Sequence, residues 1–303
     1  MLLAWSGCSA DRQPGELFGS IEEGVLVVSG TLIVDQALPD LFVRRTADPR
    51  DLYDATALGV PDAAVEVTSQ GTRWRYSADP DSAGRYLPPT PRPIVTSQTT
   101  YRLEVRAGAD VATAATTTPG RLELVRTVLL DEKTLAVAAE LVPFTAGADS
   151  VFSAPQNQLI YRDGIVEMQL ARLVDDAVAY QLSLTGLDRE SDFVIEADFL
   201  EEDDFEDFER EGASPPLEVS EGHVRLPWFA IAFGGRHVLR VFAIDENWYD
   251  LIRTNQADGG GFGGLAGDAF ERPVFQVEGA IGLFGSAAAD SVGIVILPRP
   301  GGD

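Results

Sequence analysis

The densest group of potential metal ligands is an acidic stretch at residues 201–209. It includes Glu202, Asp203 and Asp204, whose carboxylate oxygens are the ligands that hard cations such as Ca²⁺ prefer. These three residues are therefore candidate metal ligands. The stretch lacks the Asp-x-Asp-x-Asp-Gly spacing of a calcium-binding loop, and runs of charge are usually solvated. We expect a solvated loop or short helix, in which Phe205 packs one turn from its neighbouring phenylalanine.

The residues for acid–base or nucleophilic catalysis are few. His223 and His237 lie in strand-like segments, and no Gly-x-Ser-x-Gly motif occurs. Paired carboxylates could hydrolyse glycosides, but such pairs arise by chance in a chain with 48 Asp and Glu. The glycine-rich run at residues 259–264 is not followed by the Lys and Ser/Thr of a phosphate-binding loop. We assign no catalytic residues and no cofactor, and we expect the protein not to be an enzyme.

Three aromatic residues are candidates for contact with a ligand or partner. Trp248 and Tyr249 precede the glycine-rich run, which contains Phe262. Aromatic rings can stack on sugars or fill an interface, although large aromatics more often form cores. We expect Asp245 to cap a short helix that carries Trp248 and Tyr249.

The single cysteine, Cys8, follows a short apolar start and the small pair Ser6-Gly7. This arrangement is typical of a bacterial lipoprotein cleavage site, where the Cys becomes the N-terminus and takes lipid on its sulfur and amine. The apolar run is shorter than that of a secretory signal and has no basic residues before it, so a free thiol in a frayed end is the alternative. We predict lipidation at Cys8, which would anchor the protein without spanning the membrane.

Composition defines the class of protein and excludes some partners. The 303 residues include 23 Lys and Arg against 48 Asp and Glu, which gives a net charge of −25. Nucleic acid is excluded as a partner because its phosphates require cationic patches. Hydrophobic residues make up 45%, which argues against global disorder. The acidity, with Lys133 as the only lysine, fits either a GC-rich genome or a high-salt habitat.

Short alternating segments predict strands from residue 24 onward. Residues 64–68 and 74–76 flank a Gln-Gly turn and predict a hairpin, and residues 101–106 give the clearest half-buried strand. Residues 165–173 and 177–184 predict a second hairpin.

The predicted fold is mostly β, with two sandwich-like antiparallel β domains and one or two short helices. We divide the chain into three segments. They are a truncated signal with its lipobox and tether over residues 1–20, a transthyretin- or immunoglobulin-like sandwich over 21–120, and a second sandwich-like domain over 121–303.

Several short pieces in order carry a family resemblance. They are Val-Ser-Gly-Thr-Leu at 28–32, Ala-Ala-Val-Glu-Val at 63–67, Gly-Arg-Tyr at 84–86, Thr-Tyr-Arg-Leu-Glu-Val at 100–105, the Thr-rich segment at 112–119, and Phe-Gly-Ser at 284–286 followed by Asp-Ser-Val at 290–292. The sequence resembles the outer-membrane lipoproteins of Gram-negative bacteria that carry a domain of unknown function. In that family an N-terminal carboxypeptidase-regulatory or transthyretin-like β-sandwich is present, and the genes often sit beside those of TonB-dependent receptors.

The resemblance implies a lipid-anchored accessory or binding protein of the outer membrane or periplasm. Its expected partner is a TonB-dependent receptor engaged in uptake, and its expected location is the cell envelope, with membrane contact through the lipid anchor only. Two alternatives stay open, namely a surface glycan hydrolase and a structural adhesin-like module.

Overall fold

The computed structural model describes residues 24–47, 54–144, 149–195, 210–219, 221–255 and 273–299. Five residues for which predictions were made lie outside these ranges, namely Cys8, Phe262, Glu202, Asp203 and Asp204. The structure does not test those predictions. Within the described ranges, no helix is long and apolar enough to cross a membrane. The strands of the described residues form two sheets, of 13 and 4 strands, and the prediction of a mostly β protein is confirmed.

The first half of the molecule is a sandwich around one apolar core. Its strands are β1 (Leu26–Ile33), β2 (Leu41–Arg45), β3 (Ala64–Ser69), β4 (Thr72–Ala78), β5 (Arg85–Leu87), β6 (Thr100–Ala107), β7 (Asp110–Thr117) and β16 (Val277–Glu278). β4 pairs with both β3 and β5 and so joins the two layers. Alternation along each strand decides which residues face inward, as in β6, where Tyr101, Leu103 and Val105 are buried. They pack against Val28 and Val43 of the opposite layer.

The second half is another sandwich, with a larger core. One layer contains β12 (Ala179–Gly186), β13 (Glu211–Ala213) and β15 (Gly235–Ile244). The other layer has the order β14-β11-β8-β9, with bounds His223–Arg225, Ile165–Leu170, Leu124–Leu130 and Val137–Glu140. Apart from the strand β17, the remaining described elements are β10 (Gln158–Ile160), the helix α2 (Glu246–Asn255) and the 3₁₀ turns η1 (Asp149–Ser153), η2 (Pro155–Asn157) and η4 (Trp228–Ala230).

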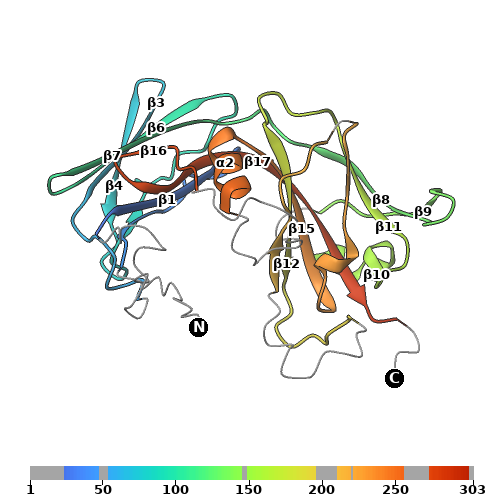
Figure 1. The fold of residues 1–303 in the computed structure, drawn as a ribbon. Coiled ribbons are helices and arrows are strands. Elements are labelled where there is room, and N and C mark those ends of the chain that lie inside the picture. Colours follow the sequence, from blue (N-terminus) through green and yellow to red (C-terminus); the bar gives the residue numbers. More distant parts are fainter. Residues whose placement is uncertain are drawn as a thin grey trace, which may run out of the picture.

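The strand β17 (Ile281–Leu297) belongs to both sandwiches, and Figure 1 shows it crossing from one to the other. Its first part pairs in parallel with β1, from Val27↔Ile281 to Ile33↔Ala287. Its second part pairs antiparallel with β15, from Ile244↔Ala287 to Gly235↔Ile296. The change of partner at Ala287 turns the strands of both halves into one continuous sheet.

Three details of the predicted strands are wrong. β11 and β12 do not form a hairpin, because they lie in different sheets and their apolar faces meet across the core. Alternation specifies the face that a strand buries but not the strand beside it. Phe229, Ile231 and Phe233 alternate in the sequence and predict a further strand, but residues 228–230 form the turn η4. The antiparallel expectation fails where β1 and β10 run parallel to β17.

The division of the chain at residue 120 stays a prediction. The structure adds that Val277 and Phe284, from the end of the chain, are buried in the first core.

Because β17 serves both cores, we expect the two sandwiches to unfold in one transition. Phe284 is buried in the first core and Ile294 in the second, and truncation of either leaves a cavity. Phe284→Ala and Ile294→Ala should each lower the free energy of unfolding by about 3–5 and 2–5 kcal/mol, respectively. Urea unfolding followed by circular dichroism and tryptophan fluorescence should show a single shifted transition for both variants.

The control is Leu297→Ala, at the exposed end of the same strand, which should change stability by less than about 1 kcal/mol. Two separate transitions, each moved by only one of the core variants, would contradict the shared-strand account.

Candidate functional site

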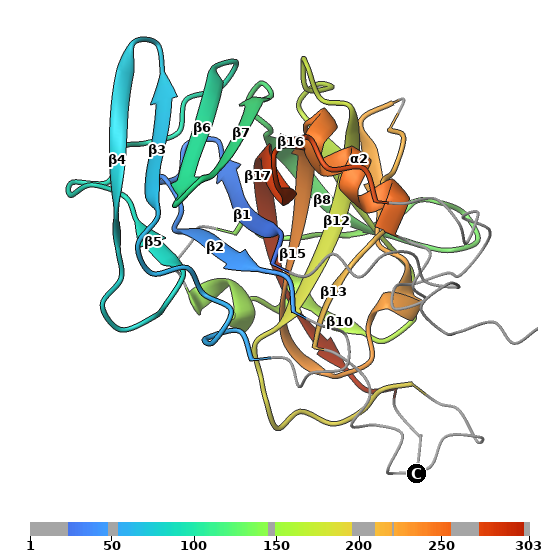
Figure 2. The ribbon, with the colours of Figure 1, turned by 60° about the vertical axis from the view of Figure 1, so that its left-hand side comes forward.

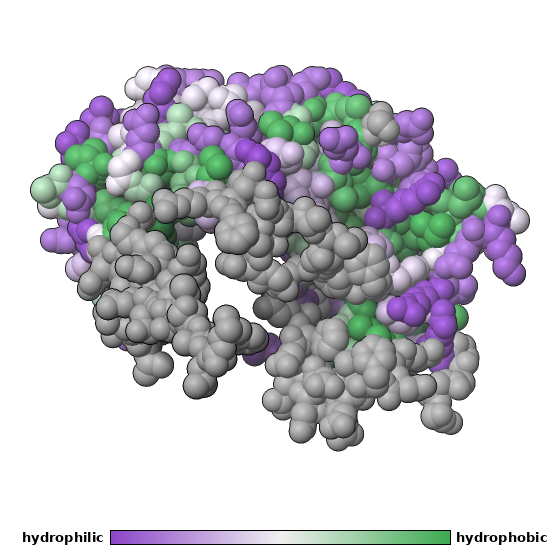
Figure 3. Space-filling model, viewed as in Figure 1, coloured by the Kyte–Doolittle hydropathy of each residue, from purple (hydrophilic) through white to green (hydrophobic). Residues whose placement is uncertain are grey.

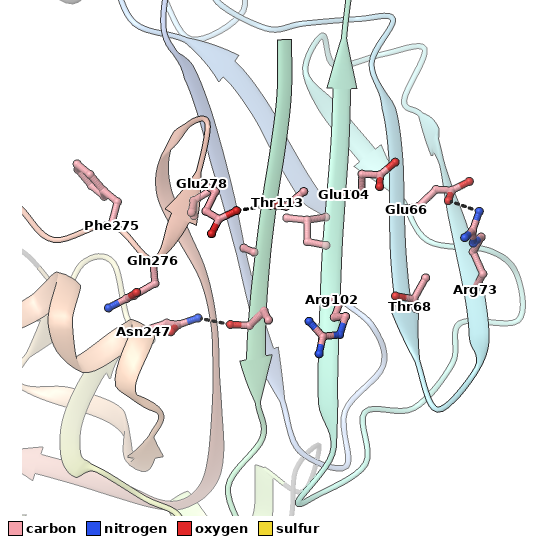
Figure 4. Close-up of a pocket in the computed structure, with 14 residues that line it drawn as sticks. Glu66, Thr68, Arg73, Arg102, Glu104, Thr113, Asn247, Phe275, Gln276 and Glu278 are labelled. Atoms are coloured by element: carbon pink, nitrogen blue, oxygen red, sulfur yellow. Dashed lines mark hydrogen bonds and ion pairs between the residues drawn. The ribbon is translucent and has the colours of Figure 1, made fainter.

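A groove of about 570 Å³ lies on the outer face of the first sandwich (Figure 4). Its floor is formed by β4, β3, β6 and β7, which lie side by side in Figure 2. Its other wall comes from β16, the residues before it and the start of α2. The lining residues are Glu66, Thr68, Arg73, Arg102, Leu103, Glu104, Thr113, Ala114, Ala115, Asn247, Phe275, Gln276, Val277 and Glu278.

The register of the strands arranges the floor in two polar rows. One row consists of Arg73, Thr68, Arg102 and Ala115, and the next consists of Arg75, Glu66, Glu104, Thr113 and Glu278. These residues alternate with the buried positions of the same strands, so the alternation that builds the core also builds the groove.

Ion pairs hold most of the charged side chains of the floor. Glu66 accepts a hydrogen bond from Arg75 at 2.7 Å and lies 3.1 Å from Arg73. Glu104 pairs with Arg106 at 2.7 Å. Glu66 and Glu104 stand directly opposite one another, where like charges repel, and the neighbouring arginines offset this repulsion. Arg102, in the other row, is exposed and makes no ion pair with any residue in the described ranges.

The charge of this face differs from that of the whole chain. Arg73, Arg75, Arg102 and Arg106 stand against Glu66, Glu104 and Glu278, so the face has four cations and three anions. The whole chain has a net charge of −25. Hydrophilic residues also extend along the upper edge of the described surface in Figure 3, over the first sandwich. This face of the sheet is therefore weakly cationic on a strongly acidic protein, and the charged residues that line the groove itself, Arg73 and Arg102 against Glu66, Glu104 and Glu278, sum to −1.

The helix α2 is fixed to the groove by its first turn. As predicted, Asp245 caps the helix, since its Oδ1 accepts a hydrogen bond from the Trp248 backbone N–H at 3.0 Å. The Asn247 amide nitrogen donates to the carbonyl oxygens of Ala115 on β7 (2.7 Å) and Phe284 on β17 (2.8 Å). A single side chain thus links the helix to β7 of the first sandwich and to the shared strand β17.

Asp245 lies in a buried polar cluster below this helix. Its Oδ2 accepts a hydrogen bond from the Thr116 hydroxyl at 2.5 Å, and that hydroxyl is 2.6 Å from the hydroxyl of Ser286. Burial raises the pKa of Asp245, and the hydrogen bonds from Thr116, Trp248 and Ser286 offset only part of this effect. The carboxylate is therefore costly to keep charged in the folded state.

The two predicted aromatic contacts within the described ranges lie beside the groove but do not line it. Trp248 packs 5.4 Å from the ring of Phe242, and Tyr249 belongs to the same small core cluster around Ile244. The residue of α2 that does reach the groove is Asn247. In the sequence, Asn247 is marked only by its position two residues after the predicted cap Asp245, in the first turn of the helix.

The two histidines are far apart in the topology and form no common site. His223 is on β14, in the four-stranded sheet, where its Nδ1 lies 2.9 Å from Glu167. His237 is buried on β15, and its Nδ1 donates to the Gly235 carbonyl at 2.9 Å. Burial lowers the pKa of His237, which favours the neutral ring. Among the described residues, no group of three or more His, Cys, Asp and Glu could hold a metal ion.

Comparison with known proteins identifies the family. A family model described as "Domain of unknown function (DUF4249)" matches residues 16–291. The chain belongs to this family. The DUF4249 match spans both sandwiches and every residue that lines the groove. The search of curated proteins gives no match to this DUF4249 chain.

Replacement of Asp245 should reveal the cost of its buried charge. Its folded pKa is raised, so its favourable contribution is full below the unfolded pKa of about 3.9 and is lost as the pH rises through the folded value. Asp245→Asn keeps a capping side chain and carries no charge. Its stability relative to the wild type should therefore increase between pH 4 and pH 7, as measured by urea unfolding.

Asp245→Ala is the comparison, because it removes the cap and leaves the Thr116 and Ser286 hydroxyls without this partner. It should be less stable than Asp245→Asn by about 1–3 kcal/mol at every pH, because neither variant titrates at this position. A difference between Asp245→Asn and wild type that does not change with pH would contradict a raised pKa.

Proposed function

We propose that this DUF4249 protein is a lipid-anchored accessory or binding protein of the cell envelope and not an enzyme. In this proposal Cys8 carries the lipid, and the groove on the first sandwich docks a TonB-dependent receptor of the outer membrane. The family membership is compatible with this proposal, which also rests on the sequence resemblance. The observation that carries it is the sheet face around this groove, which has a net charge of +1 on a chain of charge −25.

Electrostatics favours this face as the docking surface. An acidic partner is repelled by most of a strongly anionic protein and meets the least repulsion at a face with four arginines and three glutamates. Charge complementarity of this kind guides encounter and fixes orientation more than it adds affinity. Arg102 supports this role, because its guanidinium is exposed in the groove and remains available to a partner's carboxylate.

The construction of the groove also favours binding over chemistry. Its carboxylates Glu66 and Glu104 accept hydrogen bonds from arginines at 2.7 Å and are engaged in ion pairs across or along the strands. Its floor lies on paired strands and its wall on a helix tied down by Asn247. Such a surface is preorganised, which reduces the entropy lost when a partner binds.

Charge reversal on this face of the sheet should strongly reduce partner binding. The double variant Arg102→Glu and Arg106→Glu changes the face from a net +1 to −3, while both side chains are exposed. A photoreactive amino acid at Thr68, on the groove floor, should crosslink an outer-membrane receptor in native membranes, and the double variant should reduce that product at least tenfold.

A matched control places the same charge change elsewhere. The double variant Arg172→Glu and Arg189→Glu alters two exposed arginines outside the groove and should leave crosslinking from Thr68 unchanged. Recovery of no outer-membrane protein, or equal crosslinking by all variants, would overturn the docking proposal.

The anchor is tested by the intact mass of the protein from its native cells. We expect cleavage before Cys8 and added mass for a diacylglyceryl group and an acyl group. Cys8→Ala should lack both and should leave the membrane fraction. An unlipidated protein with an intact N-terminal segment would remove the anchor and reopen the glycan hydrolase and the adhesin-like module as functions.

A further inference from the structure

The second sandwich has an opening between its two layers. An apolar slot of about 330 Å³ lies where β13, at the edge of one sheet, comes near β14, at the edge of the other. Each of these edge strands has only three residues, so neither closes the sandwich. The lining is Leu182, Leu184, Gly212, Ala213, Ser214, Pro215, Leu217, Arg225, Leu226, Pro227 and Ala230. Both prolines lack a backbone donor, which keeps the slot apolar.

A polar groove of about 670 Å³ adjoins the slot. Leu217 and Arg225 line both spaces, so the two are neighbours that meet at these side chains. The groove lies over the outer face of the four-stranded sheet and is bordered by Glu167, Gln169, His223, Glu218 and Glu221. An apolar space beside a few converging polar groups is the usual form of a small-molecule site.

Arg225 is held in place at the junction by a buried carboxylate. Glu167 is only 4% exposed, and it lies 2.9 Å from Nε of Arg225 and 2.9 Å from Nδ1 of His223. Burial works to raise the pKa of Glu167, but hydrogen bonds from His223, Arg225 and Gln169 outweigh it and hold the pKa below its usual value. The charge of Arg225 is therefore offset within the protein.

The remaining charges give the groove a negative balance. Glu218 and Glu221 are exposed carboxylates, and no ion pair holds either of them within the described ranges. With Glu167 offset by Arg225, these two leave the groove with a net charge of −2. A ligand whose head lies here is favoured when that head is cationic.

We propose that the slot and the adjoining groove form a binding site for a small amphiphile with an apolar body and a cationic ammonium head. The apolar body enters between Leu182, Leu184 and Leu226, and the head lies beside Glu218 and Glu221. A cavity of roughly 150 Å³ holds one benzene molecule, so the slot accommodates a medium alkyl chain or a pair of fused rings. This site is separate from the groove of the first sandwich and does not depend on the proposed receptor.

The test uses three probes that separate the tail from the head. They are decyltrimethylammonium, decanoate and tetramethylammonium, all below micelle-forming concentration and measured by isothermal titration calorimetry on the full chain. We expect saturable 1:1 binding of decyltrimethylammonium, at least tenfold weaker binding of decanoate, and no binding of tetramethylammonium. Absence of binding by decyltrimethylammonium, or decanoate binding as tight or tighter, would overturn the proposal.

Two variants locate the site. Ala213→Trp places a large ring at the exposed mouth of the slot, outside the core, and should reduce affinity at least tenfold. Glu218→Gln with Glu221→Gln should lower the preference for the ammonium head over the carboxylate at least threefold. Circular dichroism and melting temperature verify that each variant is folded.

The matched control is Glu123→Gln with Glu132→Gln, which removes the same charge from exposed positions outside both spaces. It should leave the preference unchanged. If it reduces the preference as much as the groove variants, or if Ala213→Trp binds as the wild type does, then binding reflects the overall charge of the chain or another place on it, and the proposed site is wrong.

Discussion

The pairing of one strand with two different partners is the constraint on which the molecule depends. β17 must pair with β1 over its first part and with β15 over its second part, and Ala287 pairs with a residue of each strand. A slip of one residue would turn every side chain of a strand to the opposite face. In β17 such a slip would expose Phe284 in one core and Ile294 in the other at the same time. The shared strand therefore couples the two sandwiches more tightly than a contact between separate domains would.

The junction around Ala287 also positions the groove of the first sandwich. The helix α2 begins directly after β15, and Asp245 caps it while bonded to Thr116 of β7. Asn247 then attaches the helix to the carbonyls of β7 and β17. Polar side chains at the seam thus satisfy one another where the apolar cores end. The contacts that join the two sandwiches therefore also position the helix that forms one wall of the groove.

The sequence predicted local features better than long-range ones. The hairpin of β3 and β4, the half-buried strand β6 and the Asp245 cap all follow from turn chemistry and alternation within a few residues. The partners of β11, β12 and β17 could not be predicted, because alternation carries no information about which distant strand lies alongside. Parallel pairing of β1 with β17 joins residues about 250 positions apart, and no local signal marks it.

The same limits explain the predictions for the sites. The half-buried strand predicted at residues 101–106 contains Arg102, Glu104 and Arg106, but their grouping with Arg73 and Glu66 depends on the register of three strands. The aromatic pair Trp248 and Tyr249 drew attention as large rings near glycines, and the structure packs them on Phe242 and Ile244. The opening beside Arg225 exists because the two edge strands β13 and β14 are short. No residue type in the sequence predicts the length of these strands.

The late position of β17 in the chain has a consequence for biogenesis. Neither sandwich can complete its core until residues 281–297 have been synthesised, because this strand supplies buried residues to both. A nascent chain emerging from the ribosome therefore stays incompletely folded until β17 has emerged, with β1 and β15 both lacking a neighbour. Such a chain is open to chaperones and to threading through a translocation pore for longer than one whose first domain closes on itself.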